Sequence, residues 1–111
     1  MSETITISES ISNLLSQIQT KILDVQNRYI TKKAILKDAI ALYYSNNDFK
    51  QKVDLCTQTN KDNVMKHNEK RIVYIIDKET KKKLYAIKVY GKITMAKFVE
   101  CVLTEYEKTI N

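Results

Sequence analysis

Residues 2–8 read Ser-Glu-Thr-Ile-Thr-Ile-Ser, and the predicted fold depends on this stretch. Its centre alternates polar and apolar side chains, as Thr4-Ile5-Thr6-Ile7. A period of two is typical of a short strand with one exposed and one buried face. A strand this short leaves backbone groups unpaired unless it finds a partner. Pairing with the same strand of a second copy would meet that need in a symmetric dimer, so the sequence predicts a homodimer.

Two amphipathic helices are predicted next. Ser8 is a suitable N-cap for the first helix, which runs to about residue 29. Its apolar positions recur at helical spacing: Ile11, Leu14, Leu15, Ile18, Ile22, Val25 and Tyr29. Asn27 can adopt the left-handed conformation that ends a helix without glycine, and Thr31 can cap the second helix. The buried face of that second helix is expected to carry Ile35, Leu36, Ala39, Ile40 and Tyr43.

The middle of the chain changes character. Residues 49–70 are rich in Lys, Gln, Thr and Asn, so we expect a polar connector there. Two β-rich runs follow, at residues 72–76 and 84–90, on either side of the lysine-rich segment 77–83. This arrangement predicts a β-hairpin with a basic tip.

A last helix is predicted from Thr94 onward. Its apolar stripe consists of Phe98, Val99, Val102, Leu103, Tyr106 and Ile110. The chain is therefore predicted to be α+β, with a strand-helix-helix unit at residues 1–48, the connector at 49–70, and the hairpin with its helix at 71–111.

The composition excludes several classes of site. The 111 residues include one Gly and no Pro, where average usage predicts roughly eight and six. Phosphate cradles and nucleophile elbows need glycine, so most small-molecule enzymes are excluded. One His and two Cys cannot form a four-ligand zinc site, so neither a metal nor another cofactor is expected.

The charge and the N-terminus suggest where the protein acts. The net charge is +6, which favours polyanions such as nucleic acid or acidic protein surfaces. The start of the sequence lacks the pattern of a secretory signal, and no stretch is apolar enough to span a bilayer, so we expect a cytoplasmic protein without membrane contact. In that compartment Cys56 and Cys101 are expected to be reduced thiols, with Cys101 packed inside its helix stripe.

The order of a short ribbon, a long helix, a turn and a second helix resembles the ribbon-helix-helix family of DNA-binding repressors, antitoxins and plasmid-partition proteins. The resemblance covers residues 2–45 and is carried by Thr4-Ile5-Thr6-Ile7, the stripe from Ile11 to Tyr29, and residues 31–40, which read Thr-Lys-Lys-Ala-Ile-Leu-Lys-Asp-Ala-Ile. It implies that two ribbons pair in a dimer and enter the major groove of double-stranded DNA. A generic strand-helix-helix packing unit is the alternative interpretation.

The resemblance also implies roles for individual residues. Thr4 and Thr6, with Ser2 as a further candidate, would face base edges, where Thr hydroxyls and methyls can make contacts. The start of the second helix would clamp a phosphate with Thr31, Lys32 and Lys33. An anion on the free amides there would offset the cost of placing two lysines at a positive helix end.

A second candidate surface lies on the predicted hairpin. Phosphate contacts are expected from Lys81, Lys82 and Lys83. An aromatic and basic surface is expected from Arg71, Tyr74, Tyr85 and Lys88, because tyrosines among basic side chains can stack bases. The alternative is a solvated tip that prevents edge aggregation, with tyrosines in ordinary cross-strand packing.

These observations together predict a small non-enzymatic DNA-binding protein, a dimeric transcriptional regulator or a plasmid or viral partition factor. No acid–base pair of side chains can be named in the sequence. The alternative is a protein-interaction module whose basic hairpin binds an acidic protein surface. Charge distribution favours the alternative: residues 1–49 hold 5 basic and 5 acidic side chains, whereas residues 50–92 hold 12 and 5.

Overall fold

The structure is a computed structural model that describes residues 2–59, 71–91 and 95–110. In these ranges the chain forms five helices and one two-stranded sheet. The elements are β1 (Ser2–Ser8), α1 (Glu9–Gln26), α2 (Lys32–Ser45), α3 (Asn47–Thr59), β2 (Arg71–Asp77), α4 (Lys78–Gly91) and α5 (Met95–Lys108). The predicted α+β class is confirmed, with a larger share of helix than expected.

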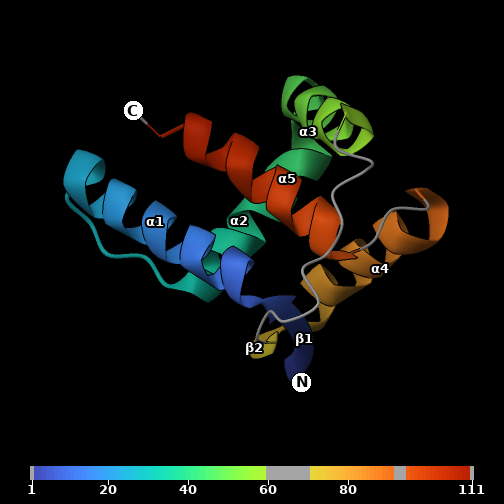
Figure 1. The fold of residues 1–111 in the computed structure, drawn as a ribbon, viewed down its shortest axis with the longest axis horizontal. Coiled ribbons are helices and arrows are strands. Elements are labelled where there is room, and N and C mark those ends of the chain that lie inside the picture. Colours follow the sequence, from blue (N-terminus) through green and yellow to red (C-terminus); the bar gives the residue numbers. More distant parts are fainter. Residues whose placement is uncertain (1, 60–70, 92–94, 111) are drawn as a thin grey trace.

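Helix α2 crosses the middle of the molecule and contacts α1, α3, α4 and α5 (Figure 1). The sheet lies at the bottom of this view beside the N-terminus, and α3 lies at the top. Helices α1 and α4 extend to opposite sides, on the left and right. One core joins the sheet and all five helices.

Strand β1 has the two faces that its alternation predicts. Ile5 and Ile7 are buried, whereas Thr4 and Thr6 are exposed. The expected partner is corrected, because β1 runs antiparallel to β2 of the same chain, from Ser2 opposite Asp77 to Ser8 opposite Arg71. Strand β2 matches β1 in its length of seven residues, five of which are β-branched or aromatic, so the chain itself satisfies one edge of β1.

The two helices that follow β1 begin and end where the capping residues predict. The Ser8 hydroxyl accepts a hydrogen bond from the amide of Ile11 at 3.3 Å, and that of Thr31 accepts one from Ala34 at 3.1 Å. Asn27 ends α1 in the left-handed region, with φ of 52°. The predicted core positions of α2 are all buried. This part of the sequence prediction is confirmed except at the end of α1: the helix stops at Gln26, and Val25 and Tyr29 are exposed and lie outside the buried stripe.

The predicted polar connector is wrong for its first part, because residues 47–59 form α3. Three residues at four-residue spacing, Phe49, Val53 and Thr57, bury one narrow face. The Asn46 side chain caps the helix by accepting a hydrogen bond from the amide of Phe49 at 3.0 Å. Polar composition hid this stripe, because the other faces of α3 are solvated. The rest of the connector lies outside the described residues.

The predicted hairpin is also wrong. Residues 78–91, expected to supply its basic tip and second strand, form helix α4. Thr80 and Leu84 are buried and Ile87 is half-buried, which is a helical spacing, and β2 already pairs with β1. The β propensity of the segment was outweighed by burial of this face, since β propensity depends strongly on packing context.

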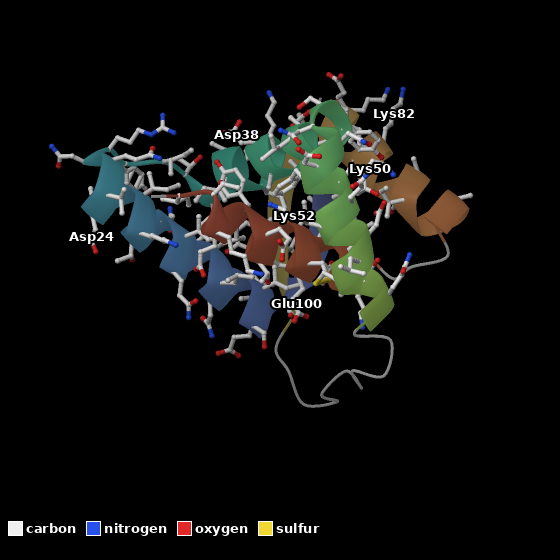
Figure 2. The ribbon with its side chains drawn as sticks, turned by 90° about the horizontal axis from the view of Figure 1, so that it is seen from above. Asp24, Asp38, Lys50, Lys52, Lys82 and Glu100 are labelled. Carbon is white, nitrogen blue, oxygen red and sulfur yellow. A yellow bond between two sulfur atoms is a disulfide. The ribbon has the colours of Figure 1, made fainter. Side chains whose placement is uncertain are left out.

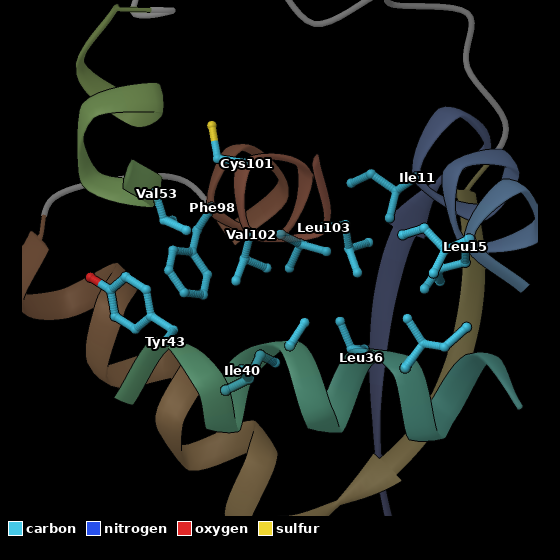
Figure 3. Close-up of a cluster of buried hydrophobic side chains, with 14 of the residues drawn as sticks. Ile11, Leu15, Leu36, Ile40, Tyr43, Val53, Phe98, Cys101, Val102 and Leu103 are labelled. Atoms are coloured by element: carbon cyan, nitrogen blue, oxygen red, sulfur yellow. The ribbon is translucent and has the colours of Figure 1, made fainter. Parts of the chain in front are cut away.

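Helix α5 confirms the predicted last helix and fills the centre of the core. Phe98, Val102 and Leu103 point from α5 toward α2, where Leu36 and Ile40 face them (Figure 3). The rings of Phe98 and Tyr43 meet edge to face, with centroids 4.9 Å apart. Ile110, just beyond α5, is buried as well.

The cysteines differ from expectation. Cys56 of α3 and Cys101 of α5 form a disulfide, with their Cα atoms 5.8 Å apart. Cys101 is buried as predicted, but its sulfur points out of the stripe toward α3 (Figure 3). Cys56 lies in the segment predicted to be a connector, so no sequence pattern indicated that it is next to α5. The prediction of two reduced thiols is wrong for this structure.

Candidate nucleic-acid interface

Helix α4 begins directly after β2, and Asp77 fixes the junction. Its carboxylate accepts two hydrogen bonds from Thr80, one from the amide at 3.0 Å and one from the hydroxyl at 2.6 Å. The Thr80 hydroxyl lowers the pKa of Asp77, so the carboxylate stays charged near neutral pH. A charged cap at this position stabilises the helix start that carries the lysines.

One face of α4 is buried and the opposite face is exposed. Leu84 is 1% exposed, whereas Tyr85 is 44% and Val89 is 66% exposed. Lys78 and Lys82 are exposed on the same stripe as Tyr85 and Val89. These four positions fall within about 60° of the helix circumference at 3.6 residues per turn. The exposed stripe of α4, meaning Lys78, Lys82, Tyr85 and Val89, therefore begins with lysines and ends with apolar groups.

Two further lysines flank this stripe, each beside a tyrosine ring. The Lys81 ammonium lies 5.6 Å from the ring centroid of Tyr85. The Lys83 ammonium lies 5.7 Å from the ring centroid of Tyr44, whose hydroxyl donates a hydrogen bond to the Lys83 carbonyl at 2.9 Å. Contacts of this kind hold lysines over aromatic faces. The contacts between Lys83 and Tyr44 also attach α4 to the last turn of α2.

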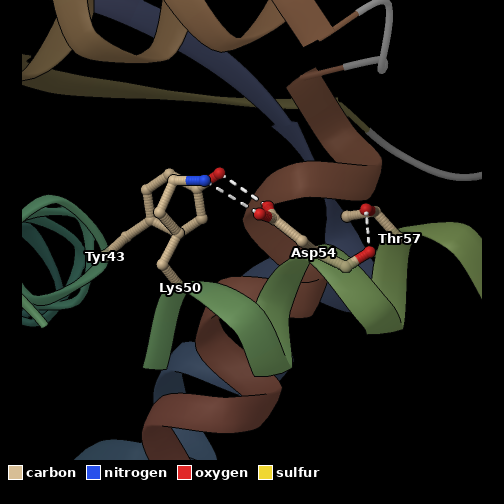
Figure 4. Close-up of polar contacts among 4 residues, drawn as sticks. All are labelled: Tyr43, Lys50, Asp54 and Thr57. Atoms are coloured by element: carbon tan, nitrogen blue, oxygen red, sulfur yellow. Dashed lines mark hydrogen bonds and ion pairs between the residues drawn. The ribbon is translucent and has the colours of Figure 1, made fainter. Parts of the chain in front are cut away.

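A polar network supports the neighbouring helix α3 (Figure 4). The Tyr43 hydroxyl donates to one Asp54 carboxylate oxygen at 2.7 Å, and the Lys50 ammonium pairs with the other at 3.0 Å. Burial raises the pKa of Tyr43, and the hydrogen bond to Asp54 raises it further, so the phenol stays protonated. The network fixes the orientation of α3 against α2 and is structural.

The residues expected at the N-terminal site are dispersed. Thr4 and Thr6 lie on the exposed face of β1, while the side chain of Ser2 lies outside the description. At the predicted phosphate clamp, Lys33 is exposed and Lys32 is half-buried. These lysines begin α2, and the Tyr44 hydroxyl that bonds the Lys83 carbonyl lies about 18 Å further along the helix. Between them, Lys37 lies close enough to Asp77 to help lower its pKa.

The residues expected to form one surface on the hairpin lie on different elements, β2 and α4. The Tyr74 hydroxyl is hydrogen-bonded to the Ser12 hydroxyl at 2.8 Å, so Tyr74 belongs to the core-facing side of the sheet. Tyr85 points outward from α4, and the side chains of Arg71 and Lys88 lie outside the description. Lys81, Lys82 and Lys83 are on one helix instead of a loop, and Lys82 lies at the margin of the molecule (Figure 2).

Three exposed residues were not among the surface candidates predicted from the sequence: Tyr44, Lys78 and Val89. The signal for two of them was present, because Lys78, Lys82, Tyr85 and Val89 have the i, i+4, i+7, i+11 spacing of one helix stripe. Recognising it required a helix at 78–91. Tyr44 gave no such signal, since its role depends on the contact between α2 and α4.

The described residues offer little for other kinds of chemistry. They hold no group of three or more His, Cys, Asp or Glu side chains that could bind a metal ion. A hollow of about 650 Å³ between α2, α3 and α5 is lined by charges of both signs, Asp48 and Glu105 with Lys52 and Lys108. Within the described ranges, no helix has the length and apolarity needed to cross a membrane.

Among the described residues, basic and exposed aromatic side chains thus lie together on α4. Its chemistry suits phosphate oxygens, because Lys only donates hydrogen bonds and carries a full charge. Comparisons with family models, with curated proteins and with solved structures found no match to this chain.

Proposed function

We propose that this chain is a small non-enzymatic protein that binds double-stranded DNA through the lysines of α4. The observation that carries the proposal is the placement of Lys78, Lys81, Lys82 and Lys83 in the first two turns of one helix, α4, whose far end projects from the body of the molecule. Because β1 pairs with β2, the proposal places the main contact on α4 and gives Thr4 and Thr6 no leading part. A transcriptional regulator or partition factor is the role we propose for such binding.

The physical basis is the release of counterions. Each phosphate neutralised by a lysine frees a condensed cation, so binding weakens steeply as salt rises. The net charge of +6 adds a favourable long-range field. Two carboxylates lie close to the four lysines: Asp77, which caps the helix at Thr80, and Glu79, which is loosely paired with Lys83 at 4.0 Å. The local balance on α4 therefore favours an anionic partner.

An acidic protein surface is the second candidate partner. Tyr85 and Val89 favour it, because exposed apolar and aromatic groups beside lysines are common in protein interfaces. The two candidates differ in one measurable respect. A protein partner would leave duplex DNA unbound at physiological salt, whereas the proposed function requires duplex binding.

The proposal includes a homodimer. In the described part of the chain the sheet has two strands, so β1 has one edge without a strand neighbour. A second copy could pair there antiparallel through its own β1 and extend the sheet to four strands. The mass in solution, measured by sedimentation with and without a short duplex, tests this part. A monomer under both conditions would refute the dimer and leave DNA binding to be judged separately.

Replacing Lys78 and Lys82 with alanine is expected to weaken binding to every duplex, because two positive charges are lost from α4. Each lost phosphate contact should reduce the slope of log K against log salt by about 0.9. Fluorescence anisotropy across a salt series measures both quantities. Alanine is also a good helix former, so α4 should persist.

The matched control removes the same charge elsewhere, at Lys52 on α3 and Lys108 on α5. It should lower affinity only slightly, through the reduced net charge. Equal losses of DNA affinity in the two double variants would mean that binding depends only on the net charge of the protein. The binding surface would then not be α4. Failure of the unaltered protein to bind duplex DNA even at low salt would refute the proposed function.

A further inference from the structure

The shape of α4 and the order of side chains along it suggest how it would meet DNA. The helix has 14 residues and is therefore about 21 Å long. Its buried face is fixed by Thr80 and Leu84, while Figures 1 and 2 show its far end extending away from the other helices. The major groove of B-form DNA is about 12 Å wide and accepts one α-helix. The exposed face of α4 is thus free to enter it along its length.

We infer that α4 lies in the major groove with the exposed stripe toward the base edges and Val89 against a thymine methyl group. This inference rests on the proposed function and names the part of the DNA that the same surface reads. The choice of DNA as the occupant follows from charge complementarity, because lysines at positions 78, 81, 82 and 83 accompany the stripe.

The two flanks of the stripe differ in charge. Lys81 lies on one side, about 60° from Lys78 around the helix, and can reach phosphates of one strand. On the other side Glu79, whose side chain is 81% exposed, lies between the stripe and Lys83, about 100° from Lys78. The Lys83 side chain is held over the Tyr44 ring, which keeps this flank attached to α2.

The stripe itself changes chemistry from its start to its end. Lys78 and Lys82 can donate hydrogen bonds to guanine O6 and N7 or to phosphates. Val89 has no polar group, and at 66% exposure it has apolar surface left to bury. The C5-methyl of thymine is the apolar group that the major groove displays. Thymine is therefore the base that the last turns of α4 are suited to recognise.

The test compares a short duplex of alternating A·T pairs with the same duplex carrying uracil in place of thymine. Uracil lacks only the C5-methyl group. The protein should bind the thymine duplex about fourfold more tightly for each methyl group contacted, the factor that corresponds to ~0.8 kcal/mol of apolar burial. Val89→Ala should bind the two duplexes nearly equally, because the contact surface is gone.

Val73→Ala is the matched control. Val73 is 63% exposed and lies opposite Thr6 on the outer face of the sheet, so the same change is made at similar exposure on a different surface. It should keep the thymine preference of the unaltered protein. Loss of the preference in Val73→Ala and not in Val89→Ala would overturn the inference and assign base reading to the sheet.

Two further outcomes separate this inference from the proposed function. Equal binding of the thymine and uracil duplexes would overturn groove reading by α4 while DNA binding through phosphates stood. A same-length RNA duplex should bind more weakly, because the A-form major groove is too narrow for a helix. RNA binding as tight as that of the thymine duplex would also overturn the inference. No binding to any duplex would refute both.

Discussion

Removing the Cys56–Cys101 link is expected to lower the free energy of unfolding by about 4 kcal/mol, because a cross-link across 45 positions strongly restricts the unfolded chain. The link joins α3 to α5, and the sequence between them contains residues 60–70 and all of α4. The melting temperature should fall on the order of 15 °C or more when the oxidised protein is treated with a reductant. Urea unfolding followed by circular dichroism gives the free energy directly.

Cysteine variants distinguish the cross-link from simple packing. Cys56→Ala, Cys101→Ala and the double variant should lose similar amounts, because either single change already opens the link. If packing alone mattered, the buried Cys101 would cost more than the half-buried Cys56, and the two losses would add. Two titratable thiols in protein purified without reductant, together with no effect of reductant on stability, would contradict the prediction.

The parts of the fold that sequence analysis located correctly are those with broad local signals. Helices α1, α2 and α5 each bury a wide apolar stripe, and the caps at Ser8 and Thr31 are single residues with a known geometry. An apolar stripe or a cap is defined by residues within one or two helical turns. It does not depend on what packs against the helix, so it can be recognised from the sequence alone.

Helices α3 and α4 were missed because their signals are narrow or mixed. In α3 only every fourth residue is buried, as Phe49, Val53 and Thr57, among polar neighbours. In α4 the run from Leu84 to Tyr90 is rich in β-forming residues. The segment is nevertheless a helix that packs against α5 and α2, with Leu84 buried and Tyr85 exposed. Tertiary contacts decided both cases, and a local pattern cannot contain them.

The pairing of β1 also depends on a contact that a local sequence pattern cannot contain, here between segments far apart in the chain. The alternation at residues 4–7 correctly predicted a strand with a buried isoleucine face. Whether its mate is a second copy or a distant segment of the same chain depends on β2, more than sixty residues later. Loop closure over that distance adds little extra entropy cost, so distance along the sequence does not exclude such a mate.

The candidate site was predicted in part. Lysines 81–83 were selected for their charge, and the structure places them on one helix beside exposed tyrosines, although as α4 and not as a hairpin tip. Tyr74 was assigned to the same surface and is instead hydrogen-bonded to Ser12 on the core side. Charge could be counted from the sequence, whereas the direction of each side chain required the correct secondary structure.

Phe98→Ala is expected to lower the free energy of unfolding by about 3–5 kcal/mol, because truncating a fully buried aromatic leaves a cavity that the core fills only in part. Phe98 is 1% exposed and packs against Tyr43 where α2, α3 and α5 meet (Figure 3). A domain of this size has about 5–15 kcal/mol of stability in total, so the loss is a large share and the variant should unfold at much lower urea.

Two companion variants make the result specific. Phe98→Leu retains most of the volume and should lose clearly less, which separates cavity formation from a failure to fold. Tyr29→Ala truncates an aromatic that is 74% exposed and should change stability by no more than about 0.5 kcal/mol. A loss below about 1 kcal/mol in Phe98→Ala would mean that α5 does not pack on α2 through this side chain. The placement of Cys101 against α3, one turn further along α5, would then lose its support as well, since the same helix orientation directs both side chains.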